Sequence, residues 1–387
     1  MSPQSPTVMP APPRLAATDL IDPTTSDPEL IGPSLIDRTL IDPTIGMATD
    51  STSGGGGATG VPGTHTPGDR DPSGGATAAT RGQLFGQRLV TALLVIGPGV
   101  ALGIVVPLAW GHVISLLDIV LGVVLYLITG HGITIGFHRL FSHRSFTPNR
   151  ALKIFLASAG SMAVQGSVIG WVTEHRRHHR FSEKPGNPHS PHEFGRGLRQ
   201  QLRGFFHAHV GWLFKSNPSS SEHYAPDLVA DKDLFTVSRL FPAFAIASFV
   251  LPFALGWAIS GSVIGGLTAL LWAGAVRMML MHHVTWSINS VCHLFGKRPF
   301  RTRERSTNFA PLAVLSMGES WHNLHHAYPT SARHGALRGQ VDSSARIISW
   351  FEKLGWAKDV RWPEPQRLMA LAVVQADEPP LRTRRRR

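Results

Sequence analysis

The histidines of this sequence gather in clusters, and their spacing is the feature that could support chemistry. Among 20 histidines, one cluster follows the pattern H-x4-H, two follow H-x2-H-H, and one further histidine stands apart. These nine residues are His138, His143, His175, His178, His179, His293, His322, His325 and His326. Positions i, i+3 and i+4 share one face of a helix, so three imidazoles can converge there.

Neutral imidazole is a ligand for first-row transition metals such as iron, zinc and copper. Nine imidazoles exceed the four ligands of one tetrahedral zinc, so the pattern predicts two metal ions with four or five ligands each. The remaining histidines fit no cluster, and we expect them only to form hydrogen bonds. They include His282, His283 and the loop residues His189, His192, His207, His209 and His223.

Four apolar runs must position these clusters. They cover residues 89–110, 112–136, 240–260 and 262–281. About 20 apolar residues suffice to cross a bilayer as a helix, so we predict four transmembrane helices, with the last two forming a tight hairpin. The apolar segments between Ala151 and Ile169 are shorter and are interpreted as an interfacial or buried helix.

The charge pattern predicts the orientation of these spans. Lys and Arg are absent from the linkers at 109–115 and 260–261, and are frequent before 89, between 138 and 239 and after 284. The positive-inside rule then places both termini and every histidine cluster in the cytoplasm.

Composition divides the chain into three parts. Residues 1–80 are rich in Pro, Gly, Ser and Thr and predict a disordered low-complexity tail, residues 81–360 form the membrane domain, and residues 361–387 form a basic C-terminal tail. Charged residues make up only 16% of the chain, below the roughly 25% of soluble proteins. No zinc-finger, RNA-binding or basic-zipper pattern accompanies the net charge of +12, so we expect no nucleic-acid partner.

With these motifs in place, the chain resembles the stearoyl-CoA (delta-9 acyl-CoA) desaturase family of membrane desaturases. The residues that carry the resemblance are His138–His143, Glu174–His179, Gly211–Leu213, Asn289–His293 and Gly318–His326. It extends over roughly Leu125 to Tyr328, plus the first span.

The resemblance implies an all-α integral membrane protein, with a stem of four transmembrane helices under a cytoplasmic helical cap. It implies that the nine histidines bind two iron ions and that Asn289 holds a metal-bound water. No haem motif of cytochrome b5 follows the third cluster. We therefore expect a separate electron donor, either a ferredoxin with an NAD(P)H reductase or a separate cytochrome b5.

The substrate implied by the resemblance is an acyl-CoA, whose saturated chain would receive a cis double bond at the delta-9 position in a reaction with O2. Gln165, Trp171, Thr285 and Trp286 would lie near the bend of the acyl chain. Trp171 and Trp286 could instead be anchors at the membrane interface.

Two residues are candidates for the end of the acyl tunnel. Tyr126 and Gly130 recur at the same helical spacing as Thr134 and His138, so we predict that they limit tunnel depth. Gly130 could alternatively permit close helix packing.

Four cations beside the second histidine cluster are candidates for binding the CoA phosphates. They are Arg176, Arg177, Arg180 and Lys184. Ordinary positive-inside charge is the other explanation for them.

An unactivated methylene has no acidity for a side chain to exploit, so a metal cofactor must carry the chemistry. A membrane fatty acyl hydroxylase would use similar clusters and release a hydroxylated product. A desaturase could also act on chains esterified to a lipid. A metal transporter would place ligands along a path inside the bilayer, whereas these clusters lie at one face. We expect an integral membrane enzyme of a bacterial cell membrane.

Overall fold

The computed structural model describes residues 81–373, except 109–113, 185, 196 and 216–218. All of these described residues belong to one unit. The predicted low-complexity tail at 1–80 and residues 374–387 of the predicted basic tail lie outside the described residues.

The described chain is mostly helical, as the sequence predicts. The α-helices are α1 (Arg81–Leu108), α2 (Leu116–His131), α3 (Arg150–Ser161), α4 (Val168–Arg180), α5 (Leu198–His209), α6 (Ser221–Tyr224), α7 (Pro226–Ala230), α8 (Lys232–Arg239), α9 (Phe241–Ser260), α10 (Val263–Ala269), α11 (Arg277–Ser290), α12 (His322–Ala327), α13 (Ser343–Lys353) and α14 (Pro365–Leu371). Two π-helical segments are η3 (Gly132–Ser142) and η6 (Leu270–Val276), and the 3-10 segments are η4 (Pro191–Phe194), η5 (Gly211–Phe214), η7 (Val291–His293) and η8 (Ala310–Leu312). Strands β1 (Thr147–Pro148) and β2 (Ala357–Lys358) pair antiparallel.

Three continuous helices of the described chain are long and apolar enough to cross a membrane. They are Leu116–Ser142, which joins α2 to η3, Phe241–Ser260, and Val263–His293, which joins α10, η6, α11 and η7. At 1.5 Å per residue, the 31 residues of the last helix exceed the roughly 30 Å of a hydrocarbon core. The helices therefore continue past the predicted ends of the second and fourth spans, and this extension carries His138 and His293 beyond the apolar runs.

The first predicted span coincides largely with α1, although its last two residues lie outside the described part. Helix α1 is not among the three candidate spans found in the described residues, so its passage through a bilayer stays a prediction.

The predicted hairpin of the last two spans is confirmed. Helix α9 ends at Gly261, whose φ of 65° is accessible to glycine, and α10 begins directly after Ser262. A Cβ on Gly256 would lie 2.4 Å from the Cβ of Ala269, so the two helices pack closely because a side chain is missing there.

Helix α2 begins at a capping box, which explains how an acidic residue is tolerated at the start of an apolar helix. The Asp118 backbone N–H donates to Ser115 Oγ over 3.2 Å, and the Ser115 backbone N–H donates to Asp118 Oδ2 over 2.8 Å. Asp118 also accepts a hydrogen bond from Thr268 of α10 over 3.1 Å. The carboxylate thus has hydrogen-bond partners at a helix N-terminus.

The short apolar stretch after the second span forms two helices. Helix α3 packs against η3, where a Cβ on Gly132 would lie 2.2 Å from the backbone nitrogen of Gly160. The chain then turns through Val164 and Gly166, which have φ values of 58° and 108°, before α4 starts at its Ser167 cap. The predicted buried helix is therefore α3, and the turn after it allows α4 to start a new direction.

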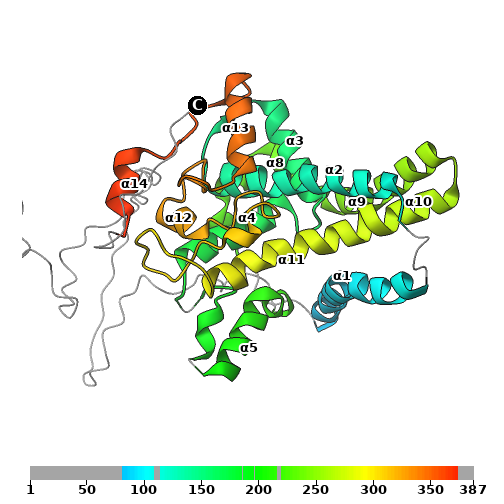
Figure 1. Cartoon of the computed structure of the whole chain (residues 1–387), viewed down its shortest axis with the longest axis horizontal. Coiled ribbons are helices and arrows are strands. Elements are labelled where there is room, and N and C mark those ends of the chain that lie inside the picture. Colours follow the sequence, from blue (N-terminus) through cyan, green and yellow to red (C-terminus); the bar gives the residue numbers. More distant parts are fainter. Residues whose placement is uncertain (1–80, 109–113, 185, 196, 216–218, 374–387) are drawn as a thin grey trace, which may run out of the picture. The chain divides into compact units, whose positions relative to one another are not determined.

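The helices that carry histidines gather at one end of the long helices. In Figure 1, α4 and α12 lie at the end opposite the turn between α9 and α10. At the histidine end, η3 contacts both α3 and α4. The folded chain also continues past residue 360. Leu368 of α14 is buried against Phe300, Leu324 and Tyr328, so the part of the predicted tail that is described packs on the domain.

Candidate metal centre

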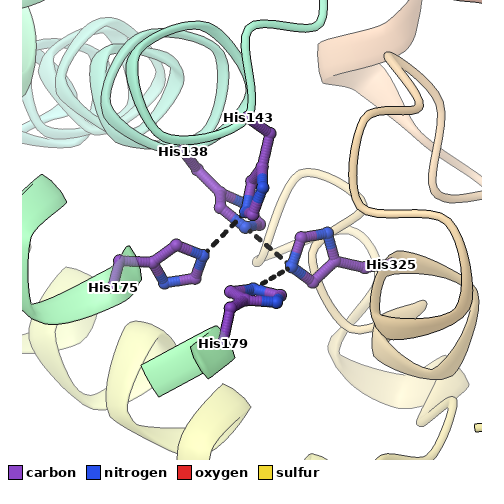
Figure 2. A group of neighbouring side chains, drawn as sticks. All are labelled: His138, His143, His175, His179 and His325. Carbon is purple, nitrogen blue, oxygen red and sulfur yellow. Dashed lines mark hydrogen bonds between the residues drawn. The ribbon is translucent and has the colours of Figure 1, made fainter. Parts of the chain in front are cut away.

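The structure brings all nine clustered histidines together. Two groups of imidazole nitrogens could each hold a metal ion: His138, His143, His175, His179 and His325 form the first, and His178, His293, His322 and His326 form the second. We call them the five-histidine group and the four-histidine group. Figure 2 shows the five side chains of the first group pointing toward one centre.

In the five-histidine group the Nε2 atoms face one another. His143 lies 2.9 Å from His175, and His325 lies 3.1 Å from His138 and 2.9 Å from His179, measured between Nε2 atoms. His138 comes from η3 and His143 follows it, whereas His175 and His179 share one face of α4 and His325 lies on α12.

The four-histidine group has the same geometry. Its Nε2 atoms are separated by 3.1 Å between His293 and His322, 2.9 Å between His322 and His326, and 3.4 Å between His178 and His326. The rings of His179 and His326 stack with centroids 4.7 Å apart, so the two groups lie side by side.

These separations fit imidazole ligands of a metal. Two nitrogens about 2.1 Å from one ion and at right angles to each other are about 3.0 Å apart. Several Nε2 lone pairs facing each other at this distance repel unless a cation or proton lies between them. The i, i+3, i+4 spacing creates this arrangement, because it divides the histidines of one helix between two neighbouring groups.

The outer nitrogens of several imidazoles meet acceptors that orient the rings. His138 Nδ1 contacts a carboxylate oxygen of Glu319, and His178 Nδ1 lies 3.1 Å from Asn187 Oδ1. An acceptor at Nδ1 favours the tautomer with its proton there, which leaves the Nε2 lone pair for a metal.

Two further carboxylates flank the four-histidine group. Glu304 lies 3.8 Å from His293 Nδ1 and 3.9 Å from His326 Nδ1, and Glu183 lies 3.6 Å from His293 Nδ1. Burying metal cations is costly unless negative charge is close by, so these carboxylates fit a site for cations.

Glu319 belongs to a buried network that sequence analysis did not assign. Its carboxylate lies 3.3 Å from Arg139 and 3.4 Å from His334 Nδ1, and Arg139 is 3.2 Å from Asp342. Burial would raise the pKa of Glu319, but the charges of His138 and Arg139 outweigh it and hold that pKa well below its usual value. Glu319 is therefore an anion that accepts from the outer nitrogen of His138.

His334 was also missed. It is fully buried, and burial followed by the charge of Arg139 lowers its pKa to about 4. His138, Glu319 and His334 form a third group of potential metal-binding atoms. Glu319 lies three residues before His322 within a motif that carried the family resemblance, and this position was the available signal. His334 stands alone in the sequence and offered none.

Seven histidines of the two groups are kept neutral by burial. Burial is the largest cause that lowers the pKa of His143, His175, His179, His322, His325 and His326 well below the usual value, and it lowers that of His178 to about 3. A neutral imidazole is the form that binds a metal, so the fold prepares these residues as ligands at neutral pH.

An apolar cavity opens beside the histidines, and small-molecule sites are typically concave and mostly apolar. Its lining includes Ile133, Thr134, His138, Trp171, His175, His178, Met281, Val284, Thr285, Ile288, Asn289, Leu315, Met317, Glu319 and His322. The candidate water ligand Asn289 is thus at the same cavity as histidines of both groups. An apolar chain in the cavity would lie directly against them.

The residues predicted near the acyl bend occupy different positions. Trp171 and Thr285 line the cavity, and the Trp171 ring stacks on His175 with centroids 5.0 Å apart. Gln165 donates to Thr285 Oγ1 over 2.9 Å and so lies behind it. Trp286 is buried beside His282 and His283 and is not among the residues that line the cavity.

The two residues predicted at the tunnel end lie behind the cavity wall. Tyr126 donates its hydroxyl to the carbonyl of Leu315 over 2.8 Å. A Cβ on Gly130 would lie 2.3 Å from Met317 Cε and 2.7 Å from Met281 Cε, and both methionines line the cavity. Gly130 faces two flexible side chains, so it does not bring two helix backbones together. Close packing of helix backbones, the alternative explanation for Gly130, instead occurs at Gly132, which faces the backbone of Gly160.

The four cations predicted to bind CoA phosphates divide into two pairs. Arg176 donates to both carboxylate oxygens of Asp227 over 2.6 and 2.9 Å, and to three main-chain carbonyls. Arg177 is buried, whereas Arg180 and Lys184 are exposed. Arg180 lies 2.9 Å from His223.

The histidines expected only to form hydrogen bonds lie outside the two groups. His209 bridges Ser290 and His283 at 3.0 Å each, and His282 Nε2 lies 2.9 Å from the carbonyl of Ala163. His192 is 2.9 Å from the carbonyl of His293, and the His189 ring stacks on His178.

Fold and site together define a helical protein with candidate membrane spans and two adjoining groups of imidazoles that could hold metal ions. Comparison with known proteins identifies the class more closely: residues 109–338 match the fatty acid desaturase family. This chain belongs to that family, and it is an oxidoreductase of lipid metabolism.

Named relatives agree with this assignment. The chain is 38% identical over 267 residues to a hex-5-enoyl-(acyl-carrier protein) acetylenase of Moorena producens, which covers 68% of this chain and 83% of the relative. It is 36% identical over 252 residues to delta-9 acyl-lipid desaturase 1 of Arabidopsis thaliana, covering 65% and 78%. It is also 36% identical over 249 residues to an sn-1 stearoyl-lipid 9-desaturase of Synechocystis sp., covering 64% and 72%.

Proposed function

We propose that this protein is an oxygen-dependent fatty acyl desaturase that inserts a cis double bond, at delta-9, into a saturated acyl chain through a di-iron centre. The observation that carries the proposal is the pair of imidazole groups, with Nε2 separations of 2.9–3.4 Å, at the wall of an apolar cavity. The names of two relatives, which include delta-9 or 9-desaturase, support the position of the double bond.

Bound iron would supply the oxidant that removes two hydrogens from unactivated carbons, which side chains cannot do. The overall reaction consumes R–CH2–CH2–R′, O2, two electrons and two protons, and yields R–CH=CH–R′ and two water molecules. An all-imidazole ligand set distinguishes this design from soluble di-iron bundles, which bind the metals through carboxylates and a Glu-x-x-His motif.

The chain's own residues perform binding and positioning. Trp171, Thr285, Met281 and Met317 would hold the acyl chain so that one pair of methylenes lies beside the histidines. The apolar lining would keep bulk water from the acyl chain, and Asn289, which lines the cavity, would hold a water on one metal. Glu319 fixes the ring of His138 through its outer nitrogen.

A lipid is the acyl carrier that we propose. The resemblance implied acyl-CoA, but Arg176 is committed to Asp227 and Arg177 is buried, so two of the four predicted cations, Arg180 and Lys184, remain exposed for phosphates. The names of two relatives specify acyl-lipid or stearoyl-lipid substrates, and another specifies an acyl-carrier protein.

The setting we propose is a bacterial cell membrane, crossed by α1 and by the three candidate spans. The positive-inside pattern supports a cytoplasmic position for both termini and for the histidines. Two electrons per turnover would come from a separate protein, a ferredoxin with its reductase or a cytochrome b5.

Expression in a desaturase-deficient host, followed by fatty acid analysis with location of the double bond, tests this function. We expect new delta-9 monounsaturated chains, no product from His175→Ala, and normal product from His223→Ala, whose imidazole is outside both groups. A hydroxylated product would favour the hydroxylase alternative. Bound metal without oxygen consumption would favour a metal carrier. Supplying the purified enzyme with stearoyl-CoA, stearoyl-(acyl-carrier protein) and a stearoyl lipid separates the three carriers.

A further inference from the structure

The segment between η7 and α12 contains a dense run of exposed cations. Within residues 297–305, which we call the basic loop, five positive side chains are exposed and the only acidic side chain, Glu304, is buried. The exposed residues are Lys297, Arg298, Arg301, Arg303 and Arg305.

The basic loop is held in a fixed conformation. Lys297 and Asn308 exchange two backbone hydrogen bonds of 3.1 and 2.7 Å, and the backbone N–H of Phe300 donates to Asn323 Oδ1 over 2.8 Å. The Phe300 ring is buried against Leu324 of α12. Arg298 fastens the loop from within by donating to Thr302 Oγ1 over 3.0 Å and to the carbonyl of Glu304. The cations are therefore presented as a defined surface.

One residue of the basic loop connects this surface to the metal centre. The Glu304 carboxylate lies 3.8 Å from His293 Nδ1 and 3.9 Å from His326 Nδ1, on the outer side of the four-histidine group. Its neighbours Arg303 and Arg305 are both exposed. A single buried side chain thus separates the basic surface from two imidazoles whose Nε2 atoms face the candidate metal position.

We propose that the basic loop is the docking surface for an acidic one-electron carrier protein, which delivers electrons through the edge of the four-histidine group. The proposal rests on the proposed function, because a desaturase needs two electrons per turnover. Each docking event would oxidise the carrier by one electron and reduce the metal centre by one electron, so one turnover needs two events.

Location argues against the other acidic partner of a desaturase, an acyl-carrier protein. Among the described residues that line the cavity, none comes from 297–305. The cavity is lined by His138, His175, His178 and His322, whereas the basic loop reaches Nδ1 of His293 and His326, which do not line it. An acyl carrier seated there would be separated from the cavity by the imidazoles themselves.

Clustered like charge accelerates encounter with an oppositely charged partner by about 10- to 1,000-fold at low salt, and salt screens the effect. The test compares a variant of the full-length protein carrying Lys297→Glu, Arg301→Glu and Arg303→Glu with wild type in nanodiscs of neutral lipid. The backbone N–H groups of Lys297 and Arg301 donate to the carbonyls of Asn308 and Leu371 over 3.1 and 2.7 Å, so these side-chain changes spare both hydrogen bonds. Stopped-flow absorbance follows oxidation of a photoreduced, acidic plant-type [2Fe–2S] ferredoxin by the iron-loaded protein.

We expect the second-order rate constant at low ionic strength to fall by about 10- to 100-fold in the variant, and to approach the wild-type value in about 0.5 M salt. The control is a variant with the same charge change at exposed cations elsewhere, Arg199→Glu, Arg346→Glu and Lys353→Glu, which should lose less than about threefold. Equal losses in the two variants, or no loss in the loop variant, would overturn the proposal. A loss that appears only when anionic lipid is present would also overturn it, in favour of lipid binding.

Reduction by a light-generated free flavin separates this proposal from the proposed function. The loop variant should accept electrons from free flavin at the wild-type rate and keep its iron content. If wild type itself accepts no electrons from either reductant, the di-iron function fails, whatever the loop does.

Discussion

We expect chain-length preference to be sensitive to a single methyl group added at Gly130, behind the wall of the cavity. In Gly130→Ala, the new Cβ would lie 2.3 Å from Met317 Cε, which must retreat by about 1.1 Å to reach an ordinary contact of 3.4 Å. The Met281 methyl group, at 2.7 Å, must also move. Both groups are the ends of flexible side chains that line the cavity, so they can move into space that an acyl chain would use.

The magnitude follows from the loss of methylene burial. If the displaced methionines exclude one or two methylenes, the 18-carbon substrate loses about 0.8–1.6 kcal/mol at about 0.8 kcal/mol per buried CH2. The ratio of kcat/KM for 18-carbon over 16-carbon substrate should then fall by about 4- to 15-fold. Gly130→Phe should move the preference further, toward chains shorter than 16 carbons.

Competition among saturated 14-, 16- and 18-carbon substrates, with products separated by gas chromatography, measures this ratio. Gly122→Ala is the matched control because it is on the same helix, and its Cβ would make only ordinary contacts of 3.8–4.0 Å with Ala273 and Trp272. Both substitutions favour the helix, so loss of folding should not confuse the result. An active Gly130→Ala enzyme with the wild-type product ratio would refute the placement of this residue behind the tunnel end.

Three further outcomes follow from the site and its packing. Glu319→Gln, which weakens the acceptor at His138 Nδ1, should lower metal affinity by about 10- to 100-fold. Elemental analysis should then show iron lost from one of the two sites, whereas the control Glu222→Gln, at an exposed residue, should keep both irons. Gly132→Ala, whose methyl group meets the backbone of Gly160 at 2.2 Å, should destabilise the protein by about 1–3 kcal/mol, visible as a lower Tm; an unchanged Tm would contradict the close helix approach. Metal-free protein should lose stability as the pH falls below about 6.5. The histidines of the unfolded chain take up protons there, whereas the buried histidines of the folded chain, whose pKa values are lowered, do not. Each such histidine changes the free energy of unfolding by up to about 1.4 kcal/mol per pH unit, and a Tm that stays constant from pH 8 to 5 would contradict this burial.

The sequence predicted which histidines gather because their spacing is a property of single helices. Positions 175, 178 and 179 share a face of α4 whatever surrounds the helix, and positions 322, 325 and 326 do the same on α12. The division into groups of five and four could not be predicted in this way. It depends on how α12 and η7 are placed against α4, which is set by packing between distant segments.

The missed residues have no periodic signal. His334 and Glu304 are single titratable residues in irregular segments, and only the folded chain brings them to the outer side of the histidines. The helix lengths were underestimated for a related reason. Hydropathy marks where a helix leaves the bilayer, but backbone hydrogen bonding continues to Ser142 and His293 beyond that point.

The basic composition after residue 360 concealed α14. The frequent charged residues of this segment indicated a solvated tail. In the structure, Leu368 anchors α14 through apolar contacts with Phe300 and Tyr328. Arg367 lies over the Tyr328 ring at 3.9 Å, so a charged side chain itself takes part in this packing.

The most direct test of the central claim is metal analysis combined with iron X-ray absorption spectroscopy on the purified protein loaded anaerobically with Fe²⁺. The account predicts two irons per chain in a shell of imidazole nitrogens at about 2.1 Å, with His178→Ala and His325→Ala each losing nitrogen scattering or iron. A single bound metal, or a two-iron spectrum unchanged in both variants, would contradict the claim that these nine imidazoles form the metal centre.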